Sequence, residues 1–146
     1  MSEVSKICIT NKSAEEMQEV NTVEVIASKG IVNDRYFNEN NDQALQITLI
    51  ESENIDYYNQ ISETNIPYVS FRRNIITEGI RLNELVGSEF FIGNVKVKAH
   101  DLCRPCKYLQ ESLKQKTLIK KLLRKAGLRC EILTSGKIFI GNKMKC

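Results

Sequence analysis

Residues 89–99 have the sequence EFFIGNVKVKA, in which two short runs of apolar and β-branched residues flank Gly93-Asn94. A two-residue turn of this composition between apolar runs is typical of a β-hairpin. Ser135-Gly136 separates two similar runs, residues 131–133 and 137–139, and predicts a second hairpin. The two motifs therefore favour antiparallel pairing of strands.

Short runs of this kind recur along the chain and predict eight strands. They are expected at residues 4–10, 22–27, 45–50, 71–77, 89–92, 95–99, 128–134 and 137–140. The spacing of apolar residues predicts helices only at residues 51–61 and 117–125, of which the second is amphipathic and basic. Many short strands with a few short helices favour a mainly β barrel or sandwich over a parallel α/β sheet.

The length and composition of the chain fit one compact domain, which we expect to extend over residues 1–146. No repeat, low-complexity stretch or linker divides the sequence. The first residues lack a signal-peptide pattern, and no apolar run reaches the roughly 20 residues that cross a bilayer. Five cysteines, an odd number, favour reduced thiols over a disulfide framework. We therefore expect a cytoplasmic protein without a membrane segment.

The net charge of +3 is small, but acidic residues crowd the first part of the chain and basic residues gather after Phe71. This asymmetry favours an anionic ligand near the second half, although most charged side chains are expected on a solvated surface. A nucleic-acid partner is disfavoured because the basic residues lack interleaved aromatic residues. The basic segment 117–125 is expected to pack its leucines on the barrel, not on a membrane.

The clearest local motif is HDLCRPCKYL at residues 100–109, which contains a closely spaced cysteine pair. A thiol–disulfide oxidoreductase would use Cys103 for attack and Cys106 to resolve the mixed disulfide. That activity belongs to an α/β fold with a downstream proline, and no proline follows Pro105 here. Two buried core cysteines are another interpretation, although the polar surroundings of the pair disfavour it.

Two further sites compete for the same pair. A structural zinc site needs four ligands, but Cys130 and Cys146 form no second close pair, and His100 is expected to form a hydrogen bond instead. A single soft thiolate for a sulfur-binding centre such as molybdenum is favoured, because Arg104 and Lys107 flank the pair and stabilise the ionised form of a thiol.

An ordered series of motifs in this chain resembles the MOSC family, the domain found at the C-terminus of molybdenum-cofactor sulfurases and in mitochondrial amidoxime-reducing components. The series is KGIVNDRY at residues 29–36, FRRNI at 71–75, LVGSEFFIG at 85–93, CRPC at 103–106, AGLRC at 126–130 and GKIFIGN at 136–142. The resemblance covers most of the chain from Lys29 onward and rests on the order and spacing of these elements.

The resemblance implies a mainly β barrel of the MOSC and pyruvate-kinase type. It implies that Cys106 is the family's invariant cysteine, a molybdenum ligand in the reducing enzymes and a proposed sulfur carrier elsewhere, whereas Cys103 matches a less constant position. Its further cofactor-binding positions are Arg72, Arg73, Asn74, Lys29, Asp34 and Arg35. Guanidinium groups and an amide at these positions would suit a terminal phosphate and a pterin edge.

The chain departs from the family pattern in two of these motifs. Asn33-Asp34-Arg35-Tyr36 stands where the family usually has Gly-Asp-Arg-His, so Tyr36 supplies no titrating imidazole there. Gly141-Asn142 stands where the family often has Gly-Asp. We expect no desulfurase domain beside these motifs and no pyridoxal phosphate in this chain.

The resulting hypothesis is a molybdenum-cofactor (molybdopterin) protein with Cys106 as metal ligand or persulfide carrier. As an oxidoreductase it would reduce N-hydroxylated bases or amidoximes with a separate electron donor. The alternative is a non-catalytic carrier of cofactor or sulfur that exchanges its cargo with biosynthetic or acceptor enzymes. A further alternative is a degenerate barrel for another anionic small molecule.

Overall fold

The computed structural model describes residues 2–12, 15–39, 42–43 and 45–146. Short strands dominate, and the helical segments fall between residues 52 and 121. The elements in chain order are β1 (Glu3–Ile9), β2 (Gln18–Val20), β3 (Thr22–Ile26), β4 (Gly30–Ile31), β5 (Ile47–Glu51), α1 (Ser52–Ser62), the 3₁₀ turn η1 (Tyr68–Phe71), β6 (Ile75–Glu78), the 3₁₀ turn η2 (Leu82–Leu85), β7 (Glu89–Ile92), β8 (Val95–Leu102), α2 (Lys107–Ser112), α3 (Leu118–Lys121), β9 (Leu128–Ile132), β10 (Gly136–Phe139) and β11 (Met144–Lys145).

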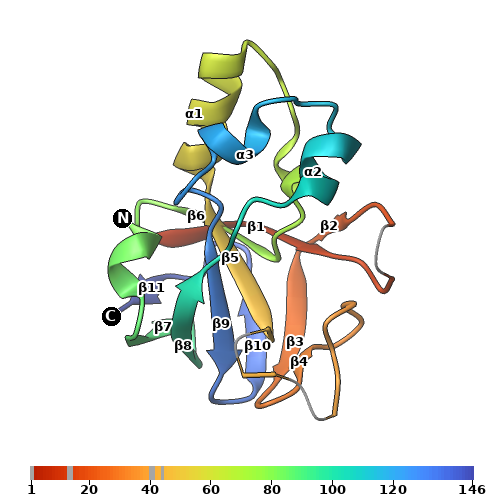
Figure 1. Ribbon diagram of the computed structural model, residues 1–146. Coiled ribbons are helices and arrows are strands. Elements are labelled where there is room, and N and C mark those ends of the chain that lie inside the picture. Colours follow the sequence, from red (N-terminus) through yellow and green to blue (C-terminus); the bar gives the residue numbers. More distant parts are fainter. Residues whose placement is uncertain (1, 13–14, 40–41, 44) are drawn as a thin grey trace.

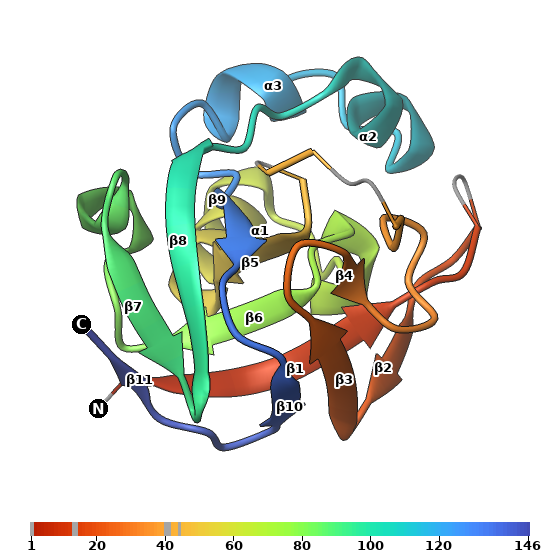
Figure 2. The same cartoon turned by 90° about the horizontal axis from the view of Figure 1, so that it is seen from below.

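Eight strands form one strongly curled sheet in the order β11-β7-β8-β9-β5-β6-β1-β2. A second sheet, β10-β3-β4, lies across the open side of this curl, so that the two sheets surround a common interior (Figure 2). Neighbouring strands are antiparallel except β5 and β6, which run parallel with Leu49 opposite Ile75. The fold is mainly β with a few short helices, as the sequence predicts.

The interior is filled by alternate residues of the strands, as a barrel-like sheet requires. In β8, Val95, Val97 and Ala99 are buried while the residues between them are partly exposed. Val25 and Ile138 of the small sheet belong to the same apolar cluster, which links the two sheets.

A second apolar cluster lies on the outer face of the large sheet, under the helices. Ile50 of β5 and Ile76 of β6 pack there with Tyr58 of α1, Leu109 of α2 and Leu118 of α3. Strand β5 is therefore buried on both faces, with Ile47 and Leu49 in the first cluster and Ile50 in the second. The three helices lie together at one end of the strands (Figure 1).

The hairpin predicted at Gly93-Asn94 is confirmed, because β7 and β8 pair on either side of it with Ile92 opposite Val95. The hairpin predicted at Ser135-Gly136 is wrong. Strand β9 pairs with β8 and β5, whereas β10 crosses to the small sheet and pairs with β3. Neither Ser135 nor Gly136 has the positive φ that a two-residue hairpin turn needs, and Ser135 Oγ instead accepts a hydrogen bond from Ala27 N.

Two predicted element boundaries differ from those in the structure. The strand expected at residues 71–77 begins only at Ile75, because a 3₁₀ turn ends at Phe71 and Arg72 has a left-handed backbone with φ +64°. The helix expected at 117–125 ends at Lys121. The sequence patterns also missed β2, β4, β11 and α2, which are short. No helix within the described residues is long and apolar enough to span a membrane.

Candidate functional site

Three separate segments meet around a cavity of about 270 Å³ at the helical end of the sheet. The segments are the loop after β4, the turn before β6, and the stretch that leads from β8 into α2. The lining residues are Arg35, Tyr36, Arg72, Arg73, Cys106, Tyr108 and Leu109. The cavity thus combines one thiol with three guanidinium groups and aromatic or apolar side chains.

The loop after β4 is held by a buried carboxylate, Asp34, whose side chain is fully covered. Its two oxygens accept hydrogen bonds from the backbone N–H groups of Thr10 (3.2 Å) and Tyr36 (3.3 Å), and Arg35 Nη1 lies 3.5 Å from Oδ1. Burial raises the pKa of Asp34, while the Arg35 charge and the hydrogen bonds oppose that rise. Asp34 therefore fixes the backbone from which Arg35 and Tyr36 reach the cavity.

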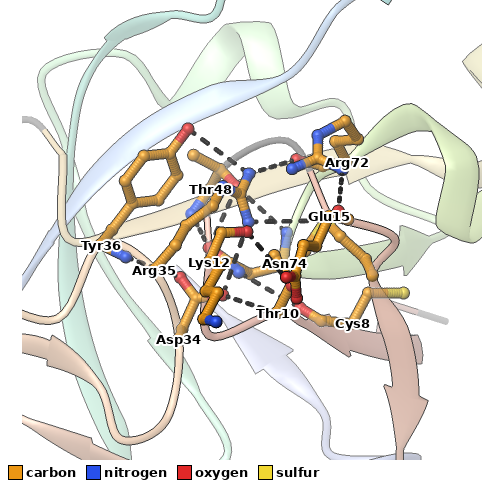
Figure 3. A network of polar contacts seen from close by, with 11 residues as sticks. Cys8, Thr10, Lys12, Glu15, Asp34, Arg35, Tyr36, Thr48, Arg72 and Asn74 are labelled. Carbon is orange, nitrogen blue, oxygen red and sulfur yellow. Dashed lines mark hydrogen bonds and ion pairs between the residues drawn. The ribbon is translucent and has the colours of Figure 1, made fainter. Parts of the chain in front are cut away.

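Arg35 joins this loop to the next one (Figure 3). Its side chain is only 5 % exposed, and Nη2 donates to the carbonyl oxygen of Arg72 at 3.1 Å and to Tyr36 Oη at 3.4 Å. The guanidinium carbon also lies 4.2 Å from the centre of the Tyr36 ring. The bond to Arg72 supports the left-handed backbone at that residue, a conformation that is costly for any residue except glycine.

The turn before β6 presents two arginines in different ways. Arg72 Nη1 donates to the carbonyl oxygen of Glu15, and its guanidinium carbon lies 5.7 Å from the centre of the Tyr108 ring. Arg73 Nε donates to the carbonyl oxygen of Ala126 at 2.8 Å. Each arginine is thus held by one backbone bond and still lines the cavity.

Asn74, the third residue of this motif, is fully buried and does not line the cavity. Its Oδ1 accepts from Thr48 N and Thr48 Oγ1, both at 3.1 Å, and its Nδ2 donates to the carbonyl oxygen of Cys8 at 3.2 Å. These contacts connect β5, β1 and the start of β6. The structure therefore gives Asn74 a role in holding the arginine turn.

Cys106 precedes α2 and is exposed at the cavity. Its Sγ accepts a hydrogen bond from Leu109 N at 3.3 Å, so the thiol occupies the capping position of this helix. This bond fixes the direction of the sulfur atom at the start of α2. Cys106 therefore offers a sulfur atom that solvent and small molecules can reach.

The three buried cysteines differ from Cys106. Cys103 is 5 % exposed, and burial raises its pKa although Arg73 and Arg129 partly oppose the rise. Burial also raises the pKa of Cys8, to about 12, and of Cys130. Thiols of this kind remain protonated at neutral pH and are poor nucleophiles. This environment supports Cys106, not Cys103, as the reactive member of the pair.

Several residues singled out in the sequence lie away from the cavity lining. Lys29 forms an ion pair with Glu39 at 2.8 Å. Arg104 and Lys107 are exposed, and Lys107 Nζ lies 4.0 Å from Glu111 Oε1. The cations that share the cavity with Cys106 are Arg35, Arg72 and Arg73 instead.

His100 and the cysteines do not gather into a zinc site. His100 Nε2 lies 2.9 Å from Glu131 Oε1, which confirms the hydrogen bond expected for this side chain. Within the described residues, no three side chains of His, Cys, Asp or Glu are grouped to hold a metal ion. The mainly β fold also differs from the α/β fold on which the thiol–disulfide interpretation depended.

Sequence reasoning missed Tyr108 and Leu109 and recorded Tyr36 only as a departure from a motif. Tyr108 and Leu109 directly follow the cysteine pair and point into the cavity because α2 begins at Lys107. A predicted helix after Cys106 would have indicated these two residues. However, α2 has only six residues, which is too short for a recognisable spacing of apolar residues.

A larger cavity of about 430 Å³ adjoins the first and shares two of its walls, Arg72 and Tyr108. Its other lining residues are Glu15, Glu16, Met17, Val69, Ser70, Ser112 and Leu113. The thiol-containing cavity and the larger one therefore meet at Arg72 and Tyr108, and the lining of the larger one includes two glutamates.

Comparison with known families and structures gives a consistent result. The sequence model of one family, described as the MOSC domain, matches residues 35–145. The YuaD protein from Bacillus subtilis has a similar structure, with a TM-score of 0.83 at 14% identity over 99% of this chain and 94% of that one.

Two YiiM structures also superpose on this chain. YiiM from Geobacillus stearothermophilus gives a TM-score of 0.81 at 16% identity, covering 99% of this chain and 74% of that one. YiiM from Escherichia coli gives 0.74 at 15% identity, covering 99% and 69%. No curated protein matches the sequence. At these identities the structural neighbours show the fold alone.

Proposed function

The chain belongs to the MOSC domain family, and on this basis we propose that it binds the molybdenum cofactor in the cavity that contains Cys106. In this proposal the Cys106 thiolate is the sulfur ligand of molybdenum. The observation that carries the proposal is one exposed thiol in a cavity that is also lined by three arginines, Arg35, Arg72 and Arg73.

The chemistry of these donors fits such a group. Thiolate is a soft ligand of the kind that suits a metal bound mainly by sulfur. The cofactor's phosphate and sulfur atoms carry negative charge, which guanidinium groups bind in a planar, forked geometry. The Tyr36 and Tyr108 rings and Leu109 give the cavity apolar walls beside which a flat pterin can lie. The thiol thus suits the metal of the cofactor, and the guanidinium groups suit its phosphate.

The protein side chains would position the bound group and its charge. Arg73 uses Nε for its bond to Ala126 and, within the described residues, makes no further hydrogen bond, so its terminal amino groups can bind an anion. Arg35 is fixed by Asp34 and by the Arg72 carbonyl, and it adds a positive charge behind the Tyr36 ring. Cys106 is oriented by the N–H of Leu109.

Molybdenum in this cofactor supplies a two-electron redox centre when bound. The proposed reaction is the reduction of an N-hydroxylated compound, in which R–NHOH takes up two electrons and two protons and gives R–NH₂ and water. The electrons come from a separate protein. The wider cavity beyond Arg72 and Tyr108 offers space for the substrate next to Cys106, within the size range of ligand pockets.

The second candidate function is sulfur carriage by a persulfide on Cys106. The exposure of this thiol favours it, because a carrier must let another protein reach the sulfur atom. A catalyst would turn over an N-hydroxylated substrate with an artificial electron donor. A carrier would only exchange sulfur or cofactor with an acceptor enzyme.

We predict that Arg73→Ala reduces the molybdenum and pterin content of the purified protein by about tenfold, the size of effect that supporting residues of metal sites usually have. The measurement is metal and oxidised-pterin analysis of protein from a host that makes the cofactor. Arg81→Ala is the matched control, because Arg81 is exposed, forms an ion pair with Glu84 and lies outside the cavity lining.

Equal cofactor content in Arg73→Ala and wild type would contradict the placement of the anionic end of the cofactor at this arginine. Unfolding curves of both variants separate this outcome from a loss of stability. We expect the Arg73 variant to lose about 1 kcal/mol through its single backbone bond, too little to unfold the protein.

A further inference from the structure

Positive charge is concentrated in residues 104–125, which we call the basic cap. This segment contains eight of the 21 lysines and arginines but only one of the 18 acidic residues, Glu111. It includes α2, α3 and the loops beside them. The remaining residues of the chain carry a net negative charge, so the excess positive charge of the protein comes from this one segment.

The basic cap lies at the same end of the molecule as the thiol-containing cavity. Helices α2 and α3 contact each other and lie beyond the ends of the strands in both views (Figures 1 and 2). Cys106, Tyr108 and Leu109 of this segment line the cavity. A protein bound to the cap would therefore sit next to the proposed redox site.

Most of the cap's charges face solvent. Five of its basic residues are exposed and form no ion pair within the part of the chain that the structure describes; they are Arg104, Lys114, Lys116, Lys120 and Arg124. Lys121 and Lys125 instead pack over Tyr58 and Tyr57 of α1. Because these five side chains form no ion pair in that part of the chain, they create a positive potential outside the cap.

Apolar side chains stand among these charges. Leu123 is 65 % exposed, and Tyr108 is 47 % exposed at the mouth of the cavity. Apolar and aromatic groups surrounded by charge are typical of protein–protein interfaces. Stacking of nucleic-acid bases would need a series of aromatic side chains, and within the basic cap Tyr108 is the only aromatic residue.

We infer that the basic cap is the docking surface for a small acidic electron-transfer protein that reduces the site at Cys106. This inference rests on the proposed function, since reduction of R–NHOH to R–NH₂ and water consumes two electrons and two protons. A reduced flavin or iron–sulfur protein supplies the electrons and is itself oxidised, and solvent supplies the protons. Such partners form small, transient complexes in which opposite charge guides association.

The test is titration of the protein with a flavodoxin, a small acidic flavoprotein, at about 50 and 200 mM salt, where screening of surface charge differs. The cap variant combines Lys114→Glu, Lys116→Glu, Lys120→Glu and Arg124→Glu. The matched control combines Lys12→Glu, Arg81→Glu, Lys137→Glu and Lys145→Glu, which changes the net charge equally at exposed positions outside the cap.

We expect wild-type binding to weaken at least about fivefold over this salt range, and the cap variant to bind at least about tenfold more weakly than the control variant at low salt. A basic redox protein such as cytochrome c should not bind the cap. Circular dichroism checks that both variants fold, and a version with glutamine at the four cap positions provides a milder change.

Equal weakening by the two variants would overturn the inference, because net charge alone would then explain the binding. Binding of a single-stranded oligonucleotide or phosphatidylserine vesicles through the cap, without binding of flavodoxin, would also overturn it. The same titration on Cys106→Ser separates the two proposals. Loss of molybdenum with docking retained supports both, whereas retained molybdenum without docking in wild type removes only the docking surface.

Discussion

Gly127→Ala is expected to destabilise the protein by at least about 3 kcal/mol, through steric strain at a special backbone position. Gly127 has φ +107°, and a Cβ atom there would lie 1.9 Å from the carbonyl oxygen of Leu49. The obstacle is the backbone of the adjacent strand β5, so it cannot move aside as a flexible side chain could. Equilibrium unfolding in urea measures the effect.

The same substitution should also disturb the functional site. The carbonyl oxygens of Ala126 and Gly127 accept hydrogen bonds from Arg73 Nε (2.8 Å) and Cys103 N (2.7 Å). This short segment therefore ties the arginine turn to the cysteine segment. A displaced Gly127 would misplace both sides of the cavity.

Gly87→Ala is the matched control for this prediction. Gly87 also has a positive φ, of +84°, but a Cβ atom there would meet nothing within 4 Å. Its cost should be near 1 kcal/mol, the ordinary penalty for a side chain in this conformation. Equal losses in the two variants would show that the close approach to β5 has no energetic consequence.

Asn74→Ala is expected to cost about 3 kcal/mol of unfolding free energy, because it leaves buried backbone groups without partners. Thr48 N and the carbonyl oxygen of Cys8 lose their hydrogen bonds to the Asn74 side chain, and both lie in the interior. Thermal or urea unfolding measures the loss. Asn65→Ala, at an exposed position, should change stability by less than about 0.5 kcal/mol.

Asn74→Asp tests whether Asn74 stabilises the protein through its hydrogen bonds or through the volume that it fills, because the two side chains have nearly the same size. The aspartate can still accept from Thr48, but an ionised carboxylate cannot donate to the carbonyl oxygen of Cys8 and would be buried near Asp34. We therefore expect it to destabilise the protein as well. Normal stability with lost cofactor in Asn74→Ala would contradict the structural role and favour direct contact with the cofactor.

The sequence pattern predicted most of the strands, because the alternation of apolar residues along a strand is a short-range property of the sequence. The β7–β8 hairpin depends on a local turn, and β8 shows alternation because one of its faces is buried. The second hairpin failed because the choice between β9 and β3 as the partner of β10 is a long-range matter. The residue types at Ser135-Gly136 permit a hairpin turn but do not require one, and neither residue has a positive φ in the structure.

The candidate site could be predicted in part. The motif resemblance pointed to Cys106, Arg35, Arg72 and Arg73, and the structure brings these four side chains to one cavity. It could not show that Asn74 points inward, because that depends on contacts with β1 and β5. Nor could it show that the flanking cations Arg104 and Lys107 are exposed and lie outside the cavity lining.

The most direct test of the central claim compares molybdenum and pterin in wild type, Cys106→Ser and Cys146→Ser, all purified from a host that makes the cofactor. Cys146 is the matched control, because it is exposed but lies at the C-terminus outside the cavity lining. The account predicts near-stoichiometric molybdenum and pterin in wild type and Cys146→Ser, and loss of at least about nine-tenths of the metal in Cys106→Ser. Equal loading of all three proteins, or wild type without molybdenum and pterin, would contradict it.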